Sequence, residues 1–138
     1  MTEIPNSAAT TREALEAAQL YVGDADIEIH SFESPLGSLA VAVAVSSEKS
    51  TQNEDSAAIV PVNGDCLVLA VADGVGGLPT GRKASNTAVE KIREALRDVE
   101  DEDARVRTAI LDGIEAANRA LLEMGTGTAT TLTVADIR

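Results

Sequence analysis

Acidic side chains occur at both ends of a segment that is predicted to fold back on itself. Glu54 and Asp55 precede one apolar run, and Asp73 ends the next apolar run. Carboxylate oxygens are the ligands that hard divalent cations such as Mg²⁺ and Mn²⁺ prefer. Gly74 follows Asp73, and the backbone of a residue without a side chain can approach a ligand closely. These residues are therefore candidates for a cation site.

Two apolar runs, 57–62 and 66–72, predict the hairpin itself. Asn63-Gly64 lies between them and is the strongest short-range signal for a type I′ turn, in which both central residues have a positive φ. Both runs are nearly continuous in apolar residues instead of alternating. Strands of this kind are typically buried on both faces, so we expect the hairpin to lie in the middle of a layered structure.

A two-residue turn at 63–64 sets a register in which Glu54 lies directly opposite Asp73, with both side chains on one face. Strict alternation directs Asp55 to the other face. Like charges that face each other repel, so protonation, splayed strand ends in water or a bound divalent cation must compensate. Solvated acids at a strand end are the alternative, because charge clusters usually face water. The residue pattern leaves these interpretations open.

The elements around the hairpin predict an α+β fold. Alternating residues predict further strands at 27–29, 39–45 and 128–137. Apolar residues spaced three and four apart predict amphipathic helices over 84–99 and 106–124. Strands joined by short turns pair antiparallel, so we expect antiparallel sheets with the two helices packed on one face. The threonine-rich stretch 126–133 is expected to act as a β-branched strand, with phosphate contact as the alternative.

The N-terminal segment is predicted to be separate from the domain. Thr10 and Glu13 have the spacing of a capping box, which favours a short helix through about Leu20. We therefore expect residues 1–24 to form a tail with a short helix and residues 25–138 to form the domain.

Composition excludes several classes of function. The 138 residues include 11 basic and 23 acidic ones, and the net charge of -12 opposes binding to nucleic acid or to an anionic membrane surface. Hydrophobic residues make up 44% and aromatic residues only 1%, so Ala, Val, Leu and Ile must build the core. Cys66 is the single cysteine and rules out an intrachain disulfide. We expect it to be a buried thiol in a cytoplasmic protein.

Four segments of the chain occur in a recognisable order. They are Asn53-Glu54-Asp55-Ser56, Ala70-Val71-Ala72-Asp73-Gly74-Val75-Gly76-Gly77, Gly81 with Ala84-Ser85, and Gly127-Thr128-Ala129-Thr130-Thr131-Leu132. Over about residues 25–137, this order resembles the N-terminal part of the metal-dependent (PPM-type, type 2C) protein serine/threonine phosphatases, and bacterial members most of all.

The resemblance implies a fold, a reaction and a set of roles. The fold of the family is an α-β-β-α sandwich, of which this chain would supply a part. The reaction is hydrolysis of phosphoric monoesters by a hydroxide that bridges two Mn²⁺ or Mg²⁺ ions. Carried over by motif, Asp73 would bridge both ions, and Glu54 and the Gly74 carbonyl would hold one of them. Asp55 would orient water, and the partner would be a protein phosphorylated on serine or threonine.

Two departures from the family's pattern modify this expectation. Ser50 stands where the family usually has a phosphate-binding arginine, and Lys49 or Arg82 is a weak substitute. The family's later metal-binding segments, Gly-Asp-Ser and the Asp-Gly and Asp-Asn that come after it, do not occur after the Gly127–Leu132 segment of this sequence. We therefore expect about the N-terminal half of a catalytic domain, which would hold at most one ion well.

Such a chain is expected to show weak phosphatase activity, or none, by itself. One alternative is a catalytically inactive remnant that acts as a binding or interaction module. Another is an enzyme that is completed by self-association or by a complementing chain.

Overall fold

The computed structural model describes residues 12–14, 17–22, 28–44, 53–75, 79–99, 103–125 and 127–138. The strands are β1 (Arg12–Ala14), β2 (Gln19–Val22), β3 (Glu28–Ser34), β4 (Gly37–Val43), β5 (Asp55–Asn63), β6 (Cys66–Val75), β7 (Ala129–Thr130) and β8 (Thr133–Ile137). The helices are α1 (Thr80–Leu96) and α2 (Asp103–Met124). The predicted α+β class and both predicted helices are confirmed.

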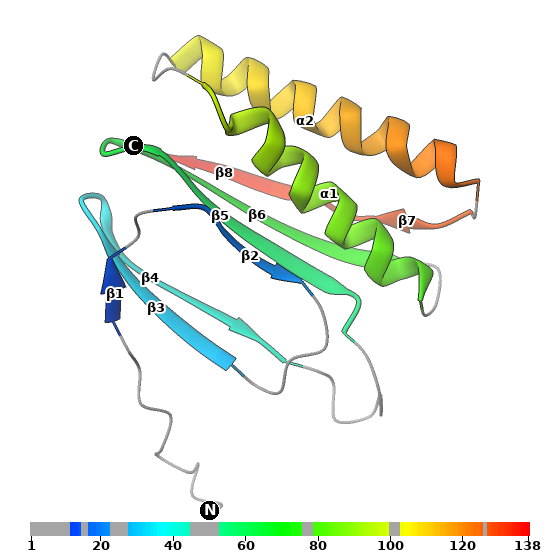
Figure 1. The fold of residues 1–138 in the computed structure, drawn as a ribbon, viewed down its shortest axis with the longest axis horizontal. Coiled ribbons are helices and arrows are strands. Elements are labelled where there is room, and N and C mark those ends of the chain that lie inside the picture. Colours follow the sequence, from blue (N-terminus) through cyan, green and yellow to red (C-terminus); the bar gives the residue numbers. More distant parts are fainter. Residues whose placement is uncertain are drawn as a thin grey trace, which may run out of the picture.

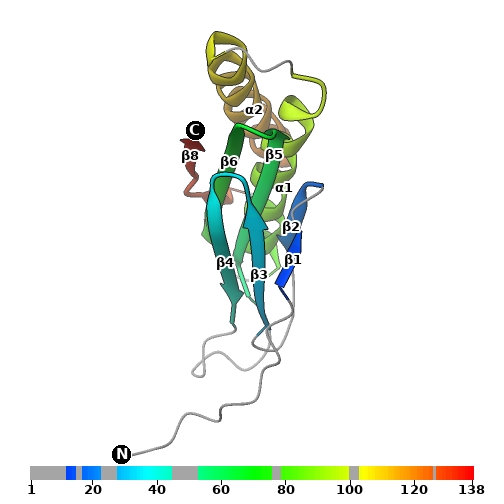
Figure 2. The same cartoon turned by 90° about the vertical axis from the view of Figure 1, so that its left-hand side faces the viewer.

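These elements form three layers. α1 and α2 cover one face of the sheet that contains β2, β5, β6 and β8, and the smaller sheet β1-β3-β4 lies on the other face (Figure 1). Figure 2 shows β3 and β4 in front of β5 and β6, with α1 behind them. Neighbouring strands pair antiparallel as predicted, except that β1 and β3 are parallel. The result is the helix–sheet–sheet part of the expected α-β-β-α sandwich.

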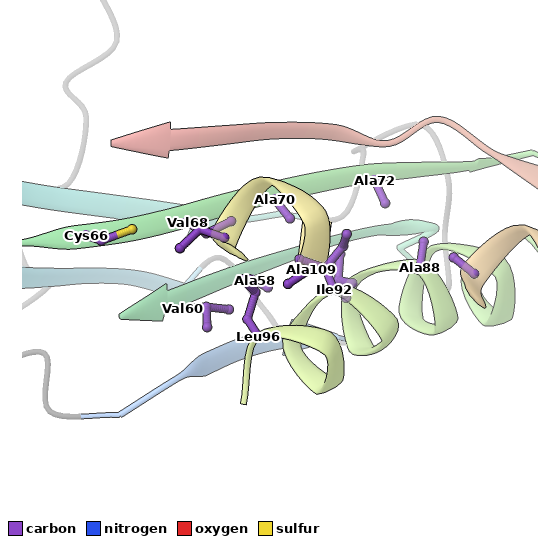
Figure 3. Packing of buried hydrophobic residues seen from close by; sticks show 13 residues of the cluster. Ala58, Val60, Cys66, Val68, Ala70, Ala72, Ala88, Ile92, Leu96 and Ala109 are labelled. Atoms are coloured by element: carbon purple, nitrogen blue, oxygen red, sulfur yellow. The ribbon is translucent and has the colours of Figure 1, made fainter. Parts of the chain in front are cut away.

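The β5–β6 hairpin lies between two apolar cores, as its continuous apolar runs predict. Even-numbered apolar residues of the hairpin pack against the helices, and the odd-numbered residues Ile59, Leu67 and Leu69 pack against the smaller sheet. The core on the helix side includes Ala58, Val60, Cys66, Val68, Ala70, Ala72, Ala88, Ile92, Leu96 and Ala109 (Figure 3). The core between the sheets is built on Phe32, Ile59 and Leu67. Alanine is frequent on the helix side, so α1 can approach the sheet closely, and the Cys66 thiol is buried there as predicted.

A glycine also brings the two helices together. A Cβ on Gly113 of α2 would lie only 3.0 Å from Ile92 Cδ1 of α1, and both residues are buried at this contact. Asp103 begins α2, where a negative charge is favoured by the helix dipole. In the part of the chain that the structure describes, no helix has the length and apolar character needed to cross a membrane.

The predicted N-terminal helix is wrong. Thr10 lies outside the described residues, but the segment after it forms β1 and β2. β2 pairs antiparallel with β5, so that Leu20 faces the core under the helices and Tyr21 faces the core between the sheets. This burial on both faces outweighs the local capping-box signal, because most of the stability of a short element comes from tertiary packing.

The predicted hairpin is confirmed, but its turn differs from the prediction. The turn residues are Gly64 and Asp65, and neither has a positive φ, so the turn is not type I′. Asn63 Oδ1 accepts a hydrogen bond from the Asp65 N–H at 2.8 Å. This side-chain bond closes the turn in the way that asparagine commonly does in loops.

The predicted register of the hairpin is also wrong. An irregularity between Pro61 and Asn63 shifts the pairing, and Asp55, not Glu54, lies opposite Asp73. Pro61 has no N–H to donate to the ladder, and such residues are tolerated where a bulge interrupts the pairing. Because side chains alternate along a strand, a shift of one residue exchanges the faces of Glu54 and Asp55.

Candidate metal and phosphate site

Three chain segments meet where β5 begins, β6 ends and α1 begins. The backbone carbonyl of Glu54 accepts a hydrogen bond from the Gly74 N–H at 3.1 Å. A Cβ on Gly74 would overlap the Gly81 carbonyl in the first turn of α1. Glycine at position 74 is therefore required by the close approach of two backbones.

The Glu54 carboxylate and the Gly74 carbonyl converge on the same point of α1. A Cβ on Gly81 would overlap Glu54 Oε1 and would lie 3.0 Å from the Gly74 carbonyl oxygen. Glu54 Oε1 is shielded from solvent at this position. The fold thus places two oxygen donors, one charged and one from the backbone, beside a residue that leaves room for them.

Asp55 and Asp73 form a second pair on the other side of the hairpin. They are direct partners across the β5–β6 ladder, and both are exposed. Together with Asn53 and Val41 they line a cleft of about 430 Å³ between the two sheets. Asn53 Oδ1 accepts the Asp55 N–H at 3.0 Å and so fixes the start of β5.

The predicted last strand is divided beside Asp73. β7 and β8 both pair with β6 in one register, Gly74 with Thr130 and Val71 with Thr133, and residues 131–132 lie between them. The Thr131 N–H donates to the Asp73 carbonyl at 2.9 Å, and the Asp73 N–H donates to Thr131 Oγ1 at 3.0 Å. Threonine hydroxyls therefore bind the backbone of β6 in addition to forming the β-branched strand that was predicted.

A buried polar group ties β5 to α1. Ser56 Oγ lies 2.6 Å from Asn86 Oδ1 and 2.8 Å from Ser85 Oγ. Either hydroxyl can be the donor between the two serines, because each has one proton and a second acceptor within reach. Ser85 Oγ also lies 3.1 Å from the Arg82 carbonyl, so the group fixes the first turns of α1 beside the site.

A family model for protein phosphatase 2C matches residues 46–136, which is most of the chain and includes every segment just described. The chain belongs to the protein phosphatase 2C family. A comparison with curated proteins found no match, and a comparison with solved structures found none either.

The segment that matches the phosphatase 2C family contains all the predicted site residues. Glu54 and Gly74 meet at α1, while Asp55 and Asp73 meet at the cleft. Arg82 is half-buried in the first turn of α1, and Lys49 lies outside the described residues. The phosphate-binding roles suggested for these two basic residues stay predictions.

Sequence reasoning missed the roles of Gly81, Ser85 and Thr131. All three belong to the segments that carry the resemblance, so the signal was present as a motif. The motif did not reveal these roles, because each residue contacts a segment that is distant in the sequence.

The phosphatase 2C family is generally metal-dependent. Two oxygen donors fit one divalent ion, because a shielded carboxylate oxygen of Glu54 and the Gly74 carbonyl converge. Asp73, the residue before Gly74, lies on the cleft side of the hairpin. Within the described ranges, no group of three or more His, Cys, Asp or Glu side chains could hold a metal ion. The fit therefore extends to one ion with a mixed side-chain and backbone ligand set.

Proposed function

We propose that this chain is a metal-dependent phosphatase domain that acts on phosphoric monoesters, with proteins phosphorylated on serine or threonine as its partners. The observation that carries the proposal is the convergence of Glu54 Oε1 and the Gly74 carbonyl at Gly81. This convergence lies within the segment that matches the protein phosphatase 2C family.

In the proposal, Glu54, Asp73 and the Gly74 carbonyl hold Mn²⁺ or Mg²⁺. Hard oxygen ligands of this kind suit both ions, and backbone carbonyls commonly complete such sites. When bound, the ion would lower the pKa of a water molecule and screen the charge of the phosphate.

The chain's own residues have separate tasks. Asp55 faces Asp73 at the cleft and is placed to accept a hydrogen bond from water and to hold its orientation. Arg82 or Lys49 would bind the phosphate oxygens, and an arginine would do so with two parallel hydrogen bonds. Gly74 and Gly81 keep side chains out of the space that the ligand oxygens share.

The second candidate function is a phosphatase-like binding module without turnover. It is favoured by the lack, in the described part of the chain, of any group of three or more His, Cys, Asp or Glu side chains that could hold a metal. For the same reason we expect the chain by itself to be weakly active or inactive.

The experiment is a calorimetric titration of the chain with Mn²⁺, followed by hydrolysis of p-nitrophenyl phosphate. Asp73→Asn should abolish Mn²⁺ binding, whereas Asp65→Asn should leave it intact. Asp65 is a matched control because it is an exposed acid at the opposite end of the same hairpin. Binding with turnover supports the enzyme, and binding without turnover supports the module. A folded chain that binds no Mn²⁺ would overturn the metal-dependent phosphatase and leave only the binding module.

A further inference from the structure

The hydrogen bonding between β6 and the strands β7 and β8 departs from the regular pattern at one residue pair. β7 and β8 share one register against β6, and this register places Thr131 opposite Asp73. In a regular antiparallel pair of this type, the two residues exchange two backbone hydrogen bonds. Here the Thr131 N–H keeps its bond to the Asp73 carbonyl at 2.9 Å, but the Asp73 N–H donates to Thr131 Oγ1 at 3.0 Å.

A side-chain hydroxyl thus replaces a backbone carbonyl as the acceptor for Asp73. This exchange occurs in the gap between β7 and β8, where the regular ladder is interrupted. Thr130 Oγ1 lies 2.9 Å from both the Asp73 carbonyl and the Thr131 carbonyl and can donate its one proton to either. Thr131 therefore binds both polar backbone groups of Asp73, one with its N–H and one with its hydroxyl.

The carboxylate of Asp73 depends on this backbone for its position. Asp73 is exposed at the cleft, and its cross-strand partner Asp55 carries the same charge and cannot attract it. Fixing the N–H and the carbonyl of one residue fixes the direction of its Cα–Cβ bond. The side chain then has fewer ways to turn from the cleft.

We infer that Thr131 is a positioning residue that sets the Asp73 carboxylate for divalent-cation binding by holding the Asp73 backbone. The inference rests on the proposed function for the metal, but its backbone part is independent of any metal. Groups that orient a ligand residue typically change metal affinity by about 10- to 100-fold when they are removed.

The test compares three variants of the full chain. Thr131→Val keeps the β-branched shape and removes the hydroxyl, while Thr131→Ser keeps the hydroxyl. Thr128→Val is the matched control, because the Thr128 hydroxyl binds the Val75 carbonyl at 3.0 Å and makes no recorded contact with Asp73 among the described residues. The readouts are the exchange rate of the Asp73 amide by NMR, the midpoint of thermal unfolding and the dissociation constant for Mn²⁺.

Thr131→Val is expected to speed exchange of the Asp73 amide by about tenfold or more and to weaken Mn²⁺ binding by about 10- to 100-fold. Thr131→Ser should restore both values, and Thr128→Val should change neither, whatever its effect on thermal unfolding. A purely structural role would move the unfolding midpoints of both valine variants without this selective loss of affinity.

Two results would overturn the inference. One is an Asp73 amide in the wild-type chain that exchanges as fast as an unprotected amide, which needs no variant to fold. The other is wild-type Mn²⁺ affinity in a folded Thr131→Val chain. If the wild-type chain binds no Mn²⁺ although its Asp73 amide is protected, the proposed function fails. The hydrogen bonds between Thr131 and the Asp73 backbone then stand as a structural feature only.

Discussion

Asp55 lies directly opposite Asp73 across the β5–β6 pair, and both carboxylates are exposed at the cleft between the two sheets. Cβ atoms of directly opposed residues are about 5 Å apart, a distance at which like charges destabilise a sheet. A cation bound beside them would attract both carboxylates and offset the repulsion between them. The stability of the chain should therefore respond to charge at this pair in opposite ways with and without divalent ions.

Asp73→Asn should make this relationship measurable. Without divalent ions, removal of one charge is expected to stabilise the fold by about 0.2–1 kcal/mol, less at high salt because the pair is exposed. With Mn²⁺, the wild-type chain should gain stability and the variant should not. Urea unfolding at low and high salt, with and without Mn²⁺, measures both effects. Loss of stability in the metal-free variant would show that the two charges do not repel in the folded state.

Gly74→Ala should be strongly destabilising. Its Cβ would overlap the Gly81 carbonyl and lie 2.9 Å from the Glu54 carbonyl oxygen, and neither backbone group can move without displacing α1 or β5. We expect a cost of about 3 kcal/mol, at the upper end for an overpacked site. Gly64→Ala is the control, because nothing lies within 4 Å of a Cβ there and its φ is not positive. Denaturant unfolding that ranks the two variants equally would contradict the close approach at Gly74.

The buried serine pair should show energetic coupling. Ser85→Ala removes a partner of the Ser56 hydroxyl and leaves a buried hydroxyl with one partner fewer, which costs about 1–3 kcal/mol. The double variant Ser56→Ala/Ser85→Ala should cost less than the sum of the single variants, because neither serine hydroxyl is then left without the other. A double-mutant cycle by urea unfolding measures this coupling, expected at about 0.5–3 kcal/mol. Simple additivity would mean that the two hydroxyls do not interact.

Ile92→Ala should expose the contribution of the core on the helix side. Ile92 is fully buried between the sheet and Gly113 of α2, so its truncation leaves a cavity and costs about 2–5 kcal/mol. Leu122→Ala is the comparison, since that side chain is 73% exposed and its loss should cost less than about 0.5 kcal/mol. Thermal unfolding of the two variants checks the difference, and similar midpoints would place Ile92 outside the main core.

The sequence predicted those features that depend on local periodicity. The helices at 84–99 and 106–124 follow from apolar spacing, and the central position of the hairpin follows from its continuous apolar runs. The structure confirms both features because the same residues that set the period also form the core.

Features that depend on contacts between distant segments of the chain were harder to predict from the sequence. The irregularity near Pro61 moves every residue of early β5 by one position, and this exchanges the faces of Glu54 and Asp55. The capping-box signal at Thr10 gave no hint that residues 19–22 pair with β5. The composition of the candidate site was therefore predictable from motifs, whereas its division into two pairs required the register.

The meeting of Glu54, Gly74 and Gly81 at one point has a consequence for how the domain folds. The donor atoms come from the start of β5 and the end of β6, and the surface that seats them comes from α1. A local opening that lifts α1 from the sheet would expose these donor atoms to water. Any cation that binds there links the start of β5 to the end of β6, and the concentration of divalent ions around the protein then becomes a variable of its folding equilibrium.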